Sequence, residues 1–389
     1  MDSCEEQLVK ELEQKKLEDE QKKAEEGSGD SSRRRRRRHH HHSRKRRKRS
    51  RRSKKKRVKR IVITVISVVL SLVLVIAALA FSMYIRGKDS MNQSNTEIKI
   101  PESIDAEQSG DYIIYKGERY RLKSNLTSIL FLGVDKRKSS EADKQIGENH
   151  QSDVIALGVI DSAGGTIKII NVPRDIMTDV NVYSPSGGYV GRERMQIALA
   201  YAYGDGKKTS CINAQEAVSR LFYNIPINTY FSMNLDGIQE INDSVGGVDV
   251  VSPETIGNFV KGEKYHLEGF DARQFVYLRD KTSPDANLKR NERQKIYLNA
   301  FIKKFIAATK KEPSTAISLF NASAPYSCTN LNADKITYLA TEFIVNRNMK
   351  YDITNVPVDV KQVENHAENY VKEQEFFEEF LSIFYNKVK

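Results

Sequence analysis

One short stretch of this sequence ends a run of β-forming residues with a guanidinium next to a carboxylate. In IKIINVPRD, residues 167–175, Pro173 is followed at once by Arg174 and Asp175. A surface ion pair at a strand end is the simplest interpretation of one such dipeptide. A phosphate or metal site would require further charged residues elsewhere in the chain.

Such residues do follow or precede other apolar segments. In KRNERQ, Arg290, Arg293 and Gln294 stand at positions i, i+3 and i+4, which is one face of a helix. Guanidinium groups match phosphate bidentately, and two aspartates at neighbouring strand ends suit a hard divalent cation such as Mg²⁺. The pattern therefore indicates a polyanion site, with an N-cap or ion pair as the alternative role of Asp175. The other charged candidates are Asp135, Arg137, Asp153, Arg279, Asp280 and Lys281.

Strands and helices that would position these residues alternate along the chain. Near-continuous apolar runs at 127–134, 153–160 and 166–172 predict strands covered on both faces. The alternation is typical of an α/β domain with a central sheet covered by helices. A hairpin turn is predicted at Lys116-Gly117-Glu118, and helices at 213–224 (capped by Asn213), 235–245, 271–280, 290–308, 333–346 and 371–387.

The N-terminal region carries the basicity of the chain. Residues 33–60 hold 20 Lys+Arg and no acidic residue, whereas residues 1–32 hold 5 Lys and 11 Asp+Glu. Because the total formal charge is +12, the chain after this tail is close to neutral. Low aliphatic content predicts that residues 1–60 are disordered, and the basic run next to a membrane span would set topology and bind anionic lipid.

Residues 61–85 contain no charged residue and are long enough to span a bilayer as a helix. A cleavable signal peptide is the alternative, since Ala78-Leu79-Ala80 resembles a cleavage site, but its apolar region usually has only ~7 to 15 residues. The Lys and Arg excess before the span places the N-terminus in the cytoplasm. We therefore expect a signal anchor, a polar linker at 86–110 and one extracellular domain at 111–389.

Other types of site find less support in the sequence. Cys4, Cys211 and Cys328 lack metal-ligand spacing; Cys211 and Cys328 would both lie outside the cell, either paired or as buried free thiols. No H-E-x-x-H motif, G-x-S-x-G motif or Cys-His arrangement is present, which argues against a peptidase. The candidates are also richer in Arg than glycoside hydrolysis by two carboxylates requires.

The motif order ILFLGVD, SDVIALGVID, IINVPRD, AYAYGDG, GGVDVV, YLRDK, RNERQ resembles the LytR-CpsA-Psr family, from about Thr127 to Gln294 and with a fitting C-terminal part. The resemblance implies a phosphotransferase of Gram-positive cell walls with a mixed central sheet. Such an enzyme moves a glycopolymer (teichoic acid, capsule or another secondary wall glycan) from an undecaprenyl-(pyro)phosphate carrier to peptidoglycan. It also implies Mg²⁺ or Mn²⁺ as cofactor and a pyrophosphatase side activity.

The resemblance further implies roles for single residues. Asp135 and Asp153 match the family's metal-site aspartates, and Arg174 matches a phosphate-binding arginine that Asp175 would orient. The implied catalytic residues are Arg174, Asp175, Arg279, Arg290 and Gln294, and the implied phosphate-binding residues are Arg137, Arg174, Arg279, Lys281, Arg290 and Arg293.

The sequence departs from the family pattern at several positions, which would affect rate and substrate choice more than the fold. Lys281 replaces an arginine, His150-Gln151 replaces a basic residue, and Asn287 replaces an aspartate that Asp285 could substitute. Gln196-Ile197-Ala198-Leu199 replaces a Lys-Ile-Asn-His run, and Arg192 or Arg194 could supply the missing charge.

Two other functions remain as alternatives. The first is a membrane-tethered receptor that binds polyprenyl-phosphate glycans without catalysis, which the departures would allow. The second is a cell-envelope transcriptional attenuator, which would need the basic tail to act on DNA. That tail has no helix-turn-helix or other base-reading element, so no nucleic-acid partner is expected.

Overall fold

The computed structural model describes residues 43–92, 98–134, 150–280, 286–312, 314–346, 348–363 and 366–388. The chain divides into two units between Leu74 and Val75, and the folded domain belongs to the second. Helix α2, Ser43–Met91, is the one helix among the described residues that is long and apolar enough to cross a membrane, with a mean hydropathy of 3.1 in its most apolar stretch. Residues 43–60, which composition predicted to be disordered, are helical in α2.

A mixed six-stranded sheet of order β12-β9-β4-β5-β6-β13 forms the centre of the domain. Strand β4 pairs antiparallel with β5 and parallel with β9, and β6 pairs parallel with β13. The three apolar runs in the sequence are the adjacent strands β4, β5 and β6, as predicted. The strands are β4 Leu126–Val134, β5 Ser152–Asp161, β6 Thr166–Asn171, β9 Thr229–Asn234, β12 Ser327–Thr329 and β13 Lys350–Asn355.

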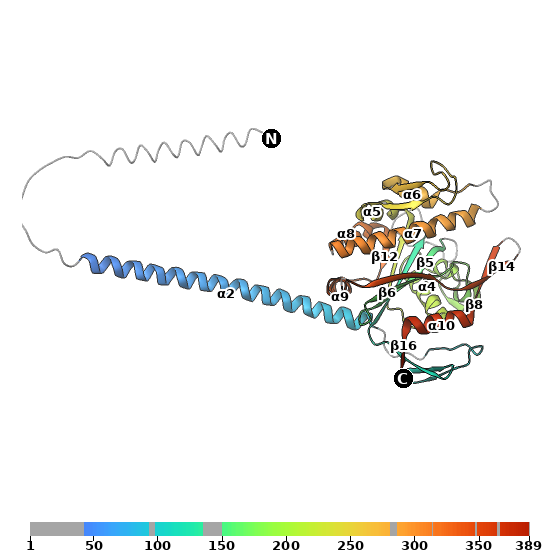
Figure 1. The fold of residues 1–389 in the computed structure, drawn as a ribbon, viewed down its shortest axis with the longest axis horizontal. Helices are drawn as coiled ribbons and strands as arrows, with labels where there is room; N and C mark the ends of the chain where they lie inside the picture. The colour runs from blue at the N-terminus through green and yellow to red at the C-terminus, as the bar shows by residue number, and fades with distance from the viewer. Residues whose placement is uncertain are drawn as a thin grey trace, which may run out of the picture. The chain divides into compact units, whose positions relative to one another are not determined.

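Helices cover both faces of this sheet, which explains its nearly continuous apolar strands (Figure 1). Side chains alternate along a strand, so Leu130 of β4 shares an apolar cluster with Ala214 of α4 on one face. On the other face, Ile129 shares a cluster with Ile306 of α7. The helices are α3 Leu199–Ala202, α4 Lys208–Leu221, α7 Ala286–Lys311, α8 Ser314–Ser323, α9 Ala333–Val345 and α10 Glu373–Phe384.

A further apolar cluster is built around Phe275 of α6, which is fully buried together with Val248 of β10. The aromatic ring of Tyr297 from α7 packs into the same cluster. This arrangement joins the C-terminal end of α6 to the first turns of α7, where charged candidates are found. The elements are η1 Leu235–Gly237, α5 Ile238–Ser244, β10 Val248–Val251, β11 Lys264–Leu267, α6 Gly269–Tyr277 and η2 Ala324–Tyr326.

The remaining strands form one small sheet and two hairpins. The predicted turn at Lys116-Gly117 joins β2 to β3, and both residues have positive φ. Residues 385–387, predicted to end a helix, belong instead to β16, which pairs with β3. The hairpins β7–β8 and β14–β15 were not predicted. The strands are β1 Ala106–Ser109, β2 Tyr112–Tyr115, β3 Glu118–Leu122, β7 Met177–Tyr183, β8 Tyr189–Gln196, β14 Val358–Val363, β15 His366–Val371 and β16 Tyr385–Val388.

Two local predictions are corrected by the fold. The segment 86–110 is not a free linker, because Ile98 and Ile104 are buried in the main core. Helix α4 begins at Lys208 rather than at Asn213, since the Asp205 carboxylate accepts the Thr209 N–H at 3.0 Å and so caps the helix earlier. Asn213 lies inside the helix and is buried.

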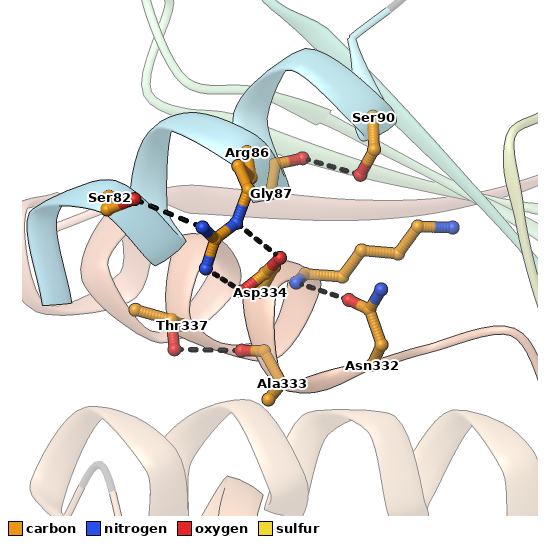
Figure 2. Close-up of polar contacts among 9 residues, drawn as sticks. Ser82, Arg86, Gly87, Ser90, Asn332, Ala333, Asp334 and Thr337 are labelled. Atoms are coloured by element: carbon orange, nitrogen blue, oxygen red, sulfur yellow. Dashed lines mark hydrogen bonds and ion pairs between the residues drawn. The ribbon is translucent and has the colours of Figure 1, made fainter. Parts of the chain in front are cut away.

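The last turns of α2 pack against α9 (Figure 2). Arg86 donates from Nε and Nη2 to the two carboxylate oxygens of Asp334, at 2.9 and 3.2 Å. Tyr84 donates its hydroxyl hydrogen to Glu342 at 2.9 Å, and Met91 is 1% exposed in the core. The helix leaves no room at Gly87, where a Cβ would lie 2.1 Å from the Asp334 carbonyl oxygen.

Replacing Gly87 with alanine should therefore lower the free energy of unfolding by about 1–3 kcal/mol, because the added methyl overpacks a backbone contact. The better helix propensity of alanine, worth about 1 kcal/mol, acts in the opposite direction and offsets part of the loss from overpacking. Chemical unfolding of the full chain in detergent measures the change. Gly191→Ala is the matched control, because nothing lies within 4 Å of its Cβ position. Equal stability of the two variants would contradict the close packing of α2 on α9.

Candidate active site

Strand register brings Arg174 opposite Asp153. In the antiparallel pair of β5 and β6, Ala156 faces Asn171, and continuing this register by three residues places position 174 opposite position 153. Pro173 has no N–H to donate, so the ladder ends there. The chain then turns, with the Ile176 N–H donating to the Pro173 carbonyl at 3.1 Å.

Two arginines converge on the Asp153 carboxylate. Arg174 donates from Nη1 to Asp153 Oδ1 and from Nη2 to Oε1 of Gln151. Arg290 Nη2 lies 3.6 Å from the other oxygen, Asp153 Oδ2. The side chains of Asp153 and Arg174 are only 10% and 20% exposed, so these charges interact more strongly than they would at the surface. Asp175 Oδ1 lies 3.4 Å from Arg174 Nε, which is compatible with an orienting role.

The backbone of Arg174 is supported by the segment that departs from the family pattern. Ala198 donates its N–H to the Arg174 carbonyl at 3.1 Å, and Ile197 donates to the Ile176 carbonyl at 2.8 Å. Gln196 Nε2 donates to the Ala367 carbonyl at 2.8 Å. These residues support the loop that carries Arg174. The departure from the family pattern at 196–199 therefore affects residues that support the site and not residues that would bind the ligand.

Arg293 is a correction to the sequence prediction, which assigned it to phosphate. Arg293 is 0% exposed. Its guanidinium donates to the carbonyls of Phe275 and Leu278 and to the Glu254 carboxylate. Burial lowers the pKa of Arg293, while Glu254 beside it opposes that change. With these donors engaged inside the protein, Arg293 anchors the end of α6 rather than binding a ligand.

Gln294 and Arg279, the other predicted site residues near α6, differ in burial and contacts. Gln294 is 9% exposed and donates from Nε2 to the Val276 carbonyl at 3.3 Å, so it also holds α6. Arg279 follows α6 directly and is exposed, and no hydrogen bond or ion pair joins it to Asp153 in the described part of the chain. Anchoring by Arg293 and Gln294 fixes the position from which Arg279 extends.

Several predicted residues lie outside the described ranges, namely Asp135, Arg137 and Lys281. Gln151 was not predicted as a site residue, although it accepts a hydrogen bond from Arg174. In the sequence, the one indication of a role for Gln151 is its position two residues before Asp153.

The carboxylates of Asp153 and Asp175 and the Gln151 amide oxygen are hard oxygen donors, so their chemistry fits Mg²⁺ or Mn²⁺. Among the described residues, no three His, Cys, Asp or Glu side chains are grouped closely enough to hold a metal ion alone. A divalent cation would therefore need a ligand beyond them, and Asp135 is the candidate that the sequence supplies.

A family model described as the LytR_cpsA_psr family matches residues 81–383. The match covers the sheet, the cluster of Arg174 and Arg290 around Asp153, which we call the arginine site, and the α6–α7 region. The chain belongs to this family. The resemblance inferred from the motifs is thereby confirmed.

Individual relatives carry informative names. The chain is 28% identical to the polyisoprenyl-teichoic acid–peptidoglycan teichoic acid transferase TagU of Bacillus cereus, over 72% of this chain and 81% of that protein. It is 29% identical to the corresponding transferase TagV of Bacillus subtilis, over 54% of this chain and 51% of that protein. The solved structure of protein gbs0355 from Streptococcus agalactiae covers 68% of this chain and 90% of that one, with 17% identity and a TM-score of 0.50. The predicted fold class, a mixed sheet covered by helices, is confirmed.

Proposed function

We propose that this chain is a membrane-anchored phosphotransferase that moves a glycopolymer from an undecaprenyl-(pyro)phosphate carrier to peptidoglycan. The convergence of Arg174 and Arg290 on Asp153 carries the proposal, because adjacent guanidiniums match the charge and shape of a phosphate. The names of the TagU and TagV relatives describe transfer of teichoic acid to peptidoglycan and support the same reaction. Pyrophosphatase activity would be the side reaction in which water replaces the sugar acceptor.

In this reaction a peptidoglycan hydroxyl oxygen forms the new bond to the transferred phosphorus. The bond from that phosphorus to the bridging oxygen breaks, polyprenyl phosphate leaves with the electron pair, and the hydroxyl proton passes to an aspartate carboxylate of the site or to water. Arg174 and Arg290 stabilise the negative charge on the transferred phosphoryl group, the dominant effect in such chemistry. Asp153 holds the two guanidiniums beside each other before the donor binds. Arg279 approaches from the end of α6 and contributes further positive charge.

Asp153 and Asp135 would hold Mg²⁺ or Mn²⁺, and the bound cation would supply positive charge to the phosphate oxygens. Asp175 stays beside Arg174 in this proposal and orients it. The requirement for two aspartates distinguishes catalysis from simple glycan binding, which the arginines alone would support.

The apolar face of the sheet supports a polyprenyl donor. Phe131 belongs to the central strand β4, yet its side chain is 40% exposed. Its ring lies 6.4 Å from that of Phe231, and a Cβ at Gly158 would come within 3.1 Å of it. In this proposal the exposed ring of Phe131, beside Phe231, would contact the lipid chain of the donor. The apolar part of α2 supports membrane anchoring, and the basic residues before it support a cytoplasmic N-terminus.

The test is incorporation of label from a polyprenyl-pyrophosphate-linked glycan into insoluble peptidoglycan by the full chain in detergent with Mg²⁺. Asp153→Asn should lower the rate at least about 100-fold, and EDTA should do the same until Mg²⁺ is restored, because both remove the metal's charge from the phosphate. Asp352→Asn is the matched control, since Asp352 pairs with Lys168 on the sheet edge.

The receptor alternative gives a different result in the same assay. Tight binding of the labelled donor with no incorporation by the wild type would contradict the transferase and favour glycan binding without catalysis. Rates for Asp153→Asn and Asp352→Asn that agree within threefold would contradict the role of Asp153.

A further inference from the structure

A basic pocket lies between the β7–β8 hairpin and helix α4. It has a volume of about 430 Å³, and none of Asp153, Arg174 and Arg290 lines it. We call it the hairpin pocket. The residues that line it and carry the argument are Lys99, Asn181, Tyr189, Arg192, Glu216 and Arg220.

Positive charge dominates the hairpin pocket. Lys99, Arg192 and Arg220 line it against the one carboxylate of Glu216. Burial lowers the pKa of Arg220, the negative charges of Glu216 and Asp179 oppose this change, and the nearby positive charge of Arg192 adds to it. The two guanidiniums therefore repel each other, and an anion bound between them would relieve the repulsion.

The hydrogen bonds of Arg220 do not use all of its donor groups. Arg220 Nε donates to the Asp179 carbonyl at 3.0 Å, and its Nη1 lies 3.6 Å from Glu216 Oε2, beyond hydrogen-bond distance. Its Nη2 is buried and has no hydrogen-bond partner among the described residues. Glu216 Oε2 already accepts a hydrogen bond from Asn181 Nδ2 at 2.6 Å. The single carboxylate is thus shared and does not neutralise three cations.

An aromatic ring and amides complete the lining. The ring of Tyr189 packs edge-on against Tyr183, with centroids 5.6 Å apart, which fixes it while leaving the residue 57% exposed. Asn224 also lines the pocket and is held at a φ of 66° by its N–H bond to the Ser219 carbonyl at 2.8 Å. A fixed aromatic face suits the apolar face of a sugar ring, the amides suit its hydroxyl groups, and the cations suit a phosphate.

We propose that the hairpin pocket binds a sugar phosphate unit of the glycopolymer, apart from the phosphate at which transfer takes place. Identifying the ligand with the transferred polymer rests on the proposed function, whereas the binding chemistry rests on the pocket alone. Binding here would hold a long donor while its pyrophosphate end occupies the arginine site, and would lower the KM for polymeric donors.

The test uses the full chain in detergent carrying Arg174→Gln, which weakens the arginine site. Equilibrium dialysis measures binding of N-acetylglucosamine 1-phosphate and of uncharged N-acetylglucosamine. The phosphate-bearing sugar should bind at least about tenfold more tightly, and adding Lys99→Gln with Arg192→Gln should abolish that preference. Tyr189→Ala should weaken both sugars severalfold. In a chain with Arg174 intact, Lys99→Gln should raise the KM for a polymeric donor and leave that for a single-unit donor unchanged.

The matched control is Lys261→Gln with Lys303→Gln, which removes two exposed positive charges elsewhere and should leave binding unchanged. Equal affinity for the two sugars, or equal binding by the pocket and control variants, would overturn the proposal. If the wild type fails to transfer glycan but the binding results hold, the proposed function fails and the sugar phosphate site stands.

Discussion

Replacing Arg174 with lysine should lower the rate of glycan transfer about 100- to 1,000-fold, the usual cost of losing one donor to transition-state charge. Lysine keeps the positive charge but lacks the planar fork of two nitrogens with which Arg174 donates to Asp153 and Gln151. The measurement is kcat with saturating polyprenyl-pyrophosphate-linked glycan.

Thermal unfolding of the same protein separates a chemical effect from misfolding. Arg119→Lys provides the matched control, because Arg119 of β3 lies over the ring of Tyr112 in β2 and takes no part in the site. A kcat for Arg174→Lys within threefold of that of Arg119→Lys would refute the role of Arg174 in transfer.

Replacing Arg293 with methionine should lower the free energy of unfolding by about 3–5 kcal/mol, because it leaves the Glu254 carboxylate, only 14% exposed, without its charged partner. The carbonyls of Phe275 and Leu278 lose their donor as well. Since Leu278 precedes Arg279, transfer should also fall as that arginine loses its fixed position. Urea unfolding and the transfer assay measure the two effects.

A second variant makes this prediction specific. Adding Glu254→Gln to Arg293→Met should recover part of the stability, because the unpaired charge is removed. Arg273→Met is the control within α6: its pair with Asp236 is partly exposed and should contribute at most about 1 kcal/mol. If Arg293→Met costs no more than Arg273→Met, Arg293 does not anchor α6.

The positions of Asp153 and Arg174 at the ends of two strands were predicted from the sequence, but their ion pair was not. The apolar runs identify the strands, whereas the antiparallel register that brings the two side chains together is seen only in the fold. Helical spacing in the same way identified α7 and α9. These predictions rest on periods of two and 3.6 residues, which the chain itself contains.

Arg293 shows what spacing alone does not determine. It shares a helix face with Arg290, but one guanidinium reaches Asp153 and the other is enclosed by α6 and Glu254. Which part of that face becomes buried depends on how distant segments pack, and helical spacing contains no such information. The prediction of a linker at 86–110 was wrong for the same reason. Its polar composition is typical of a linker, but Ile98 and Ile104 pack into a core formed by residues far away in the sequence.

If the arginine site transfers a phosphoryl-linked glycan onto a peptidoglycan sugar, the product must contain a new phosphodiester. The most direct measurement is to isolate peptidoglycan after reaction with the donor-linked glycan and to identify the new linkage by ³¹P NMR and mass spectrometry. We expect a phosphodiester between glycan and peptidoglycan sugar, formed by the wild type and at least about 100-fold more slowly by Arg174→Lys. Donor converted only to free phosphorylated glycan, with no phosphodiester on peptidoglycan, would contradict it.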